Sequence, residues 1–262
     1  MKRLLFIGNS HLAALKTAWD ATPRPGYDAE FFAAPQRTYL RMALMSGNAF
    51  GLASEGESNR QRKIAVSTNG KAAVSLVDLD IIVLVGGFSA AEAVAQVLGD
   101  CDVAALRETG APSLLSQNLF SNICTALAQA ALPEPGWHNR KDAKVVLIPR
   151  PATCETCLAS TFAGFQPWHK LAANPAGALP GFGAFDTALT TVMADHSLTY
   201  LPQPTATRTP AGLTARAFLA EGGGITPGEE HKRGDHAHMN NAYGTAVIET
   251  LLAWLDPSQP PT

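Results

Sequence analysis

The sequence lacks long apolar runs. No stretch of its 262 residues approaches the roughly 20 consecutive apolar residues that a membrane-spanning helix needs. Two basic residues open the chain, but only the four apolar residues Leu4 to Ile7 follow them. A secretory signal needs an apolar segment of about 7–15 residues. We therefore expect a cytoplasmic protein with no membrane partner.

Cysteines and charged residues are also scarce. Cys101 and Cys124 are isolated, and only Cys154 and Cys157 lie close together, so the spacing is not that of a disulfide framework. A net charge of -2 gives no basic surface that would predict nucleic-acid binding. Hydrophobic residues make up 46% and charged residues 16% of the chain, which predicts a folded protein with a buried core.

Short apolar runs alternate with helical patterns along the chain. The strands are expected at 4–8, 28–34, 79–87, 143–151 and 198–202, and the helices at 10–20, 37–45, 88–98, 114–132, 185–196 and 240–255. Such alternation favours a parallel sheet covered by helices on both faces. Asn69-Gly70, between alternating residues, predicts an inserted β-hairpin over 63–76. We expect one domain over 1–256, a flexible tail over 257–262, and long loops at 46–61, 152–180 and 203–234.

Ser10 directly follows the first predicted strand, in the stretch Phe6 to Leu15, FIGNSHLAAL. The start of the next helix offers unpaired backbone N–H groups and a positive dipole end, which suits a nucleophile that must stabilise an oxyanion. Serine is also a common helix N-cap. Ser10 alone does not separate the two interpretations.

Asp235 and His238 stand three residues apart, just before the last predicted helix. A serine nucleophile needs an imidazole base, and that base needs a carboxylate to set its tautomer. An Asp-x-x-His turn delivers both from one loop. The alternative is that Asp235 caps the helix and His238 is simply exposed.

Together, GNS at 8–10 and DHAH at 235–238 resemble the first and last sequence blocks of the SGNH/GDSL hydrolases. The resemblance implies a three-layer α/β/α sandwich with a mainly parallel, flavodoxin-like sheet of about five strands. It implies that Ser10 is the nucleophile and an oxyanion donor through its N–H group. It also implies that His238 is the general base, that Asp235 orients it, and that no cofactor is needed.

The chain departs from the family pattern at two places. Asn9 replaces the usual aspartate of the first block, and Phe88 stands where the family's third block has an oxyanion-binding asparagine. Losing that amide costs roughly two to three orders of magnitude in rate if nothing replaces it. The candidates to replace it are the backbone N–H groups of Gly86 and Gly87 and the side chain of Asn48. Ser89 and Glu92 form a capping box, which explains Ser89 structurally.

The remaining polar residues give weaker signals. His11 and Arg150 are candidates for substrate binding, although a solvated loop arginine is an equal alternative for Arg150. Cys154 and Cys157 are one pair, while a structural zinc site needs four ligands. The histidines around Asp235 fit no known metal spacing, so we expect no metal.

Three functions remain open from the sequence. The first is a serine esterase or deacylase that acts on a small-molecule or carbohydrate ester, with an O-acetylated sugar as the default substrate. The second is a carbohydrate O-acyltransferase that uses the same triad. The third is a non-catalytic binding protein on the same fold, which the missing amide keeps open.

Overall fold

A five-stranded parallel sheet forms the centre of the computed structural model, which describes residues 1–53, 59–87, 91–221 and 235–257. Its strand order is β10-β9-β6-β1-β2, the flavodoxin-like order. The strands are β1 (Lys2–Gly8), β2 (Tyr27–Ala33), β6 (Ile81–Val85), β9 (Lys144–Ile148) and β10 (Leu198–Tyr200). All five strands were expected from the sequence, and the expected α/β class is confirmed.

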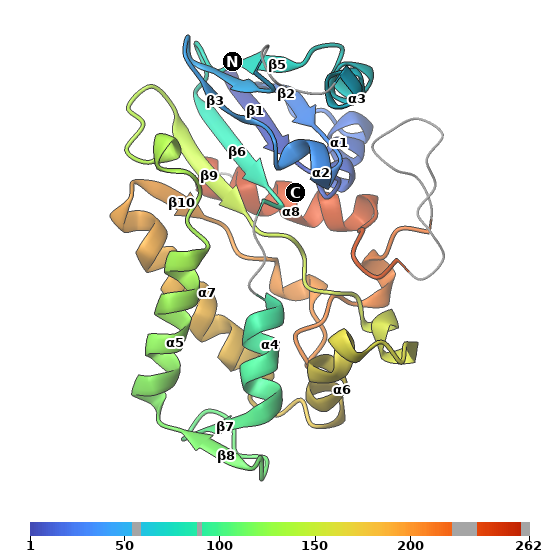
Figure 1. Cartoon of the computed structure of the whole chain (residues 1–262), viewed down its shortest axis with the longest axis vertical. Coiled ribbons are helices and arrows are strands. Elements are labelled where there is room, and N and C mark those ends of the chain that lie inside the picture. Colours follow the sequence, from blue (N-terminus) through green and yellow to red (C-terminus); the bar gives the residue numbers. More distant parts are fainter. Residues whose placement is uncertain (54–58, 88–90, 222–234, 258–262) are drawn as a thin grey trace.

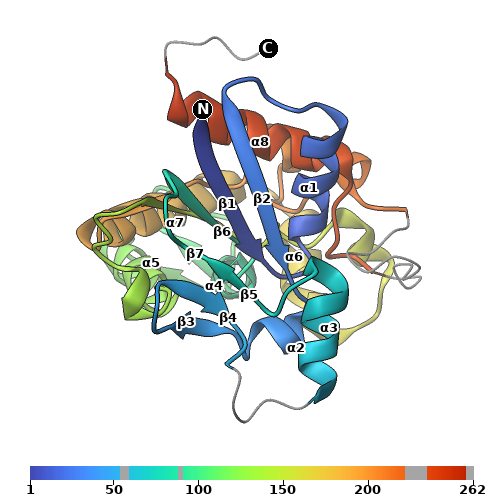
Figure 2. The same ribbon diagram turned by 90° about the horizontal axis from the view of Figure 1, so that it is seen from above.

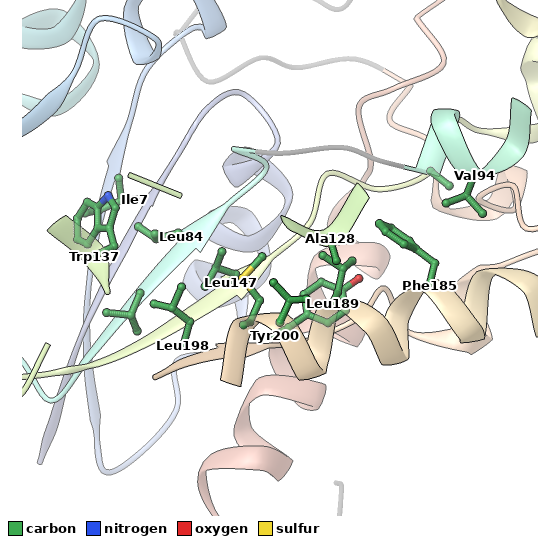
Figure 3. Packing of buried hydrophobic residues seen from close by; sticks show 14 of the residues in the cluster. Ile7, Leu84, Val94, Ala128, Trp137, Leu147, Phe185, Leu189, Leu198 and Tyr200 are labelled. Atoms are coloured by element: carbon green, nitrogen blue, oxygen red, sulfur yellow. The ribbon is translucent and has the colours of Figure 1, made fainter. Parts of the chain in front are cut away.

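Helices cover both faces of the sheet. α1 (Leu12–Ala21) and α8 (Asn241–Leu255) lie side by side on one face, where they bury a cluster that includes Phe6, Val83 and Val146 (Figure 2). α4 (Ala91–Asp100), α5 (Gln117–Ala130) and α7 (Ala178–Asp195) pack in the cluster of the other face. Figure 3 shows part of that second cluster, with Trp137 and Ile7 beside Leu84. Alternate residues of each central strand therefore face different layers.

The segment between β2 and β6 differs from the sequence-based expectation. Residues 37–45 do not form one helix: α2 (Gln36–Tyr39) is a single turn, and β3 (Ala43–Met45) pairs antiparallel with β4 (Ala49–Gly51). The inserted hairpin is thus β3–β4, and β5 (Ala73–Ser75) joins it in a second small sheet. The expected hairpin over 63–76 is wrong, because α3 (Asn59–Asn69) occupies that segment.

Asn69-Gly70 ends α3 instead of turning a hairpin. Gly70 has a φ of +72°, the left-handed conformation that also terminates helices. The Asn69 side chain bonds back to the carbonyl of Ala65 and to both backbone groups of Ala33 at the end of β2. Asn69-Gly70 therefore ends α3 and also attaches that end of the helix to β2.

The expected long loops contain regular structure. The loop predicted over 152–180 holds α6 (Gln166–Ala173) and the first turn of α7. β7 (Cys101–Val103) and β8 (Ser113–Leu115) form a separate parallel pair between α4 and α5, far from the central sheet (Figure 1). The short 3₁₀ helices are Pro135–Trp137, Glu155–Ala159, Ala163–Phe165, Thr205–Thr207 and Arg216–Phe218.

Some expectations fall on residues that the structure does not describe. These are Phe88 and Ser89 in the predicted oxyanion loop, and all of the predicted tail except Pro257. In the described part of the chain, no helix combines the length and the apolarity needed to cross a membrane.

The strand order reverses direction at β1. The chain moves from β1 to β2 in one direction, and β6 then adds to the other side of β1. In parallel sheets of this kind, ligands bind outside the carboxyl ends of the strands where the order reverses. Ser10 follows β1 and Gly86 follows β6, so both lie at this reversal.

Candidate active site

Ser10, His238 and Asp235 form a continuous hydrogen-bonded chain. Ser10 Oγ lies 2.7 Å from Nε2 of His238, and Nδ1 of His238 lies 2.6 Å from Oδ2 of Asp235. The serine and the histidine are 228 positions apart in the sequence. The predicted hydrogen bond between them is present, in the geometry that a nucleophile and its base require.

The Asp235 carboxylate is held as an anion. Burial alone would raise its pKa, but hydrogen bonds from His238 and from the backbone N–H of Ala237 outweigh it and hold the pKa well below its usual range. Oδ1 of Asp235 also accepts the backbone N–H of His238 at 3.2 Å. One carboxylate therefore orients both the imidazole ring and the backbone that carries it.

Ser10 does not cap α1. His11 occupies the N-cap position of that helix, with no capping bond from its side chain, and Ser10 lies in the preceding turn. Its hydroxyl is directed to His238. The helix-cap interpretation of Ser10 is therefore wrong for this chain.

The turn that carries His238 is anchored on both sides. The backbone N–H of Cys154 donates to the carbonyl of His236 at 2.7 Å, and that of Ala220 donates to the carbonyl of His238 at 3.0 Å. Asn240 caps α8 by accepting the N–H of Tyr243. The position of the imidazole is thus set by two neighbouring loops and by a helix start.

Asn9 joins the loop after β1 to the loop after β6. It is 1% exposed, and its side-chain nitrogen donates to the carbonyl of Gly86 at 2.7 Å and to Oε1 of Gln36 at 2.6 Å. Its side-chain oxygen accepts the N–H of His11 at 3.1 Å. An aspartate here would lack the donor that the Gly86 carbonyl needs, which explains why this chain has asparagine. No local sequence signal points to this link, because Asn9 and Gly86 are 77 positions apart.

The expectation that Gly86 stabilises an oxyanion is wrong. Its N–H donates to the carbonyl of Ile148 at 3.0 Å, as an extension of the β6–β9 pairing. Gly86 is instead needed for its conformation, with a φ of +69° and with Asn9 Oδ1 2.6 Å from where a Cβ would be. Among the described residues, no backbone hydrogen bond uses the N–H of Ser10 or of Gly87. These two N–H groups are the remaining candidates.

The expectation for Asn48 is also wrong. Asn48 lies in the β3–β4 turn, where its side-chain oxygen accepts Arg140 at 2.6 Å and its nitrogen lies 3.3 Å from Oδ2 of Asp142. Arg140 and Asp142 precede β9 and so lie at the opposite edge of the sheet from Ser10. A positive φ of 55° explains an asparagine at this turn.

His11 and Arg150 have specific partners. The ring of His11 stacks on that of His238, with 5.0 Å between centroids and 14° between planes. Arg150 follows β9 and forms an ion pair with Glu92 in the first turn of α4. His11 is therefore part of the site, and a role for Arg150 in substrate binding stays a prediction.

The four cysteines are free thiols. Cys154 and Cys157 are fully buried, and burial raises the pKa of Cys157 to about 12, so its thiol stays protonated. In the part of the chain that the structure describes, no three His, Cys, Asp or Glu side chains gather as a metal site. Cys154 contributes through its backbone, which anchors the His238 turn.

No protein-family model and no curated protein matches the chain. Among solved structures it is similar to one described as a "putative platelet activating factor from Streptococcus pneumonia", at 12% identity and a TM-score of 0.45. The alignment covers 97% of this chain and 84% of that chain. At this distance the likeness carries no functional argument, so the assignment below rests on the site itself.

Proposed function

We propose that the protein is a serine ester hydrolase of SGNH type, which forms an acyl-enzyme on Ser10. The observation that carries the proposal is the contact between Ser10 Oγ and His238 Nε2, backed by the ionised Asp235. Nucleophile, base and orienting carboxylate are the groups that acyl transfer needs, and they meet at the ligand-binding edge of the sheet.

Acylation follows from this geometry. Ser10 Oγ attacks the ester carbonyl while its proton moves to Nε2 of His238, and a new Oγ–C bond forms. The carbonyl oxygen becomes an oxyanion, which the N–H groups of Ser10 and Gly87 stabilise. The C–O bond to the alcohol then breaks as His238 returns the proton to the leaving oxygen. Asp235 stays ionised and stabilises the imidazolium.

Deacylation reverses these steps with water. His238 takes a proton from a water molecule, the resulting hydroxide attacks the acyl carbon, and the Oγ–C bond breaks as the proton returns to Ser10. The products are a carboxylic acid and the original enzyme. No step requires a metal or an organic cofactor.

Turnover of a chromogenic acetate ester tests the proposal. We expect hydrolysis by the wild-type protein and loss of that activity in Ser10→Ala, with an unchanged circular dichroism spectrum. Ser67→Ala is the matched control, because Ser67 is exposed on α3 and its hydroxyl donates to the carbonyl of Ile64 in the same helix. Activity that survives in Ser10→Ala would show that another residue is the nucleophile.

Two alternatives share this fold. An acyltransferase would pass the acetyl group to an added sugar in competition with water, and analysis of the products separates it from a hydrolase. A binding protein would show no turnover across a broad ester panel. The intact hydrogen-bonded triad favours catalysis over binding.

A further inference from the structure

An apolar pocket of about 290 Å³ opens beside the oxyanion loop. Its lining includes Leu84 and Leu147 from the central sheet, Phe50 from β4, Trp137 from a 3₁₀ helix, and Gly87, which follows β6; Glu134 is the acidic residue of the lining. The rings of Phe50 and Trp137 are 5.5 Å apart and form one wall. Neither the sequence motifs nor the triad accounts for this pocket.

Gly87 and Tyr39 connect the pocket to the reacting serine. Gly87 follows Gly86, whose carbonyl is bonded to Asn9, the residue next to Ser10. A Cβ on Gly87 would lie 3.3 Å from the hydroxyl of Tyr39, so the absence of a side chain at Gly87 leaves room beside the phenol, and both residues line the pocket. Burial raises the pKa of Tyr39 to about 12, with a further contribution from the charge of Glu134, so the phenol is neutral. Tyr39 therefore adds no charge to the pocket lining.

The two faces of the sheet decide which part of an ester enters the pocket. Leu84 and Leu147 belong to the face that packs on α5 and α7, whereas His238 precedes α8 on the other face. The leaving oxygen must face Nε2 of His238 to receive its proton. The acyl chain therefore extends away from His238, toward Gly87.

We propose that this pocket binds the acyl chain of the substrate, so that the preferred substrates are esters of medium-chain, unbranched acids of about eight carbons rather than acetates. The proposal rests on the proposed hydrolase function and specifies its substrate class. A methylene group takes up about the volume of a water molecule, about 30 Å³, so the pocket holds a chain of about this length. The apolar walls select it through burial of methylene groups.

A chain-length series measures the selection. We expect kcat/KM for p-nitrophenyl esters to rise up to about fourfold per methylene from acetate to about octanoate, and then to level off. A flat series, or a maximum at acetate, would overturn the proposal.

Leu132→Trp tests whether the acyl chain of the substrate binds in this pocket, because Leu132 lines the pocket and is far from the triad in sequence. We expect kcat/KM for octanoate to fall at least 30-fold, with that for acetate within twofold. Leu132→Ala should move the maximum to longer chains, which keeps the test decisive if the tryptophan variant does not fold. Leu119→Trp, on the exposed side of α5, is the matched control and should change neither rate.

Three results would count against the acyl-chain assignment. Equal loss of acetate and octanoate turnover in Leu132→Trp would place the pocket outside chain recognition. A loss confined to acetate esters of long alcohols would assign the pocket to the alcohol instead. If the wild-type protein hydrolyses no ester, the hydrolase proposal fails, and titration with octanoate by calorimetry then decides the pocket alone. Octanoate binding to the wild-type protein that is lost in Leu132→Trp would support a medium-chain site. The absence of octanoate binding to the wild-type protein would overturn the proposal.

Discussion

Gly244 of α8 lies directly against the backbone of Ala14 in α1. A Cβ at position 244 would be 2.0 Å from the carbonyl oxygen of Ala14, so the two helices approach as closely as only glycine allows. α1 begins just after Ser10, and α8 begins just after His238. This close packing therefore sets the distance between the proposed nucleophile and its base.

Gly244→Ala should separate α1 from α8. We expect a loss of about 1–3 kcal/mol in the free energy of unfolding because of overpacking. Esterase activity should fall with it, because the Ser10–His238 hydrogen bond lengthens. Gly183→Ala is the matched control: Gly183 lies in α7 with open space at its Cβ, so alanine there should stabilise the helix by up to about 1 kcal/mol and leave activity unchanged. Urea unfolding and steady-state kinetics measure both, and full activity in Gly244→Ala would contradict the role given to this contact.

Asn9→Asp introduces the residue usual in the SGNH/GDSL hydrolases that the sequence resembles, yet it should impair this protein. The change replaces the donor to the Gly86 carbonyl with a carboxylate oxygen, which leaves a buried acceptor unsatisfied at a cost of about 1–3 kcal/mol. Displacement of the oxyanion loop should lower kcat/KM by about 10²-fold.

Asn69→Asp is the control for this change. Asn69 also donates to two backbone carbonyls, those of Ala33 and Ala65, but it does not hold the Gly86 loop. It should lose similar stability and keep its kcat/KM at a temperature where it is folded. Improved turnover in Asn9→Asp would show that the link between the loops is not needed.

Asp235→Asn should keep the fold and reduce kcat by about 10³–10⁴-fold. An amide can present its NH₂ group to Nδ1 of His238, which favours the tautomer that cannot accept the proton of Ser10. The measurement is ester turnover alongside thermal unfolding. A loss below tenfold would mean that another group orients His238.

The contribution of Asp235 to stability should depend on pH. Its folded-state pKa lies below the unfolded value of about 3.9, so the carboxylate stabilises the fold above about pH 5. That contribution is lost as the pH falls below about 4, toward the folded-state pKa. The difference in unfolding free energy between the wild-type protein and Asp235→Asn should thus shrink from pH 7 to pH 3. A difference that grows toward low pH would contradict the assigned ionisation.

Strands β1, β6 and β9 could be predicted because each contains a continuous apolar run that is buried in the sheet. β2 is an edge strand, in which exposed Asp28 and Glu30 alternate with partly buried residues. The site residues could be predicted because Ser10 and the Asp235–His238 turn lie next to elements that the sequence marks clearly. Both motifs are local, and the parallel sheet brings their positions to one edge.

Other features could not be predicted because distant contacts decide them. Asn69-Gly70 suits both a hairpin and a helix end, and the bonds from Asn69 to β2 select the helix end. The helix expected at 185–196 begins earlier, at Ala178, and Gly181 lies inside it, where a Cβ would be 2.7 Å from Leu98. The Asn9–Gly86 hydrogen bond and the pocket beside Gly87 are formed by segments that are far apart in the chain, so no local sequence pattern predicts them.

The covalent intermediate on Ser10 is the most direct test of the central claim. Intact-mass spectrometry after reaction with a fluorophosphonate should show one adduct, and peptide mapping should place it on Ser10. The adduct should be absent from Ser10→Ala and should form far more slowly in Asp235→Asn. An unlabelled wild-type protein, or a label on any residue other than Ser10, would contradict the account.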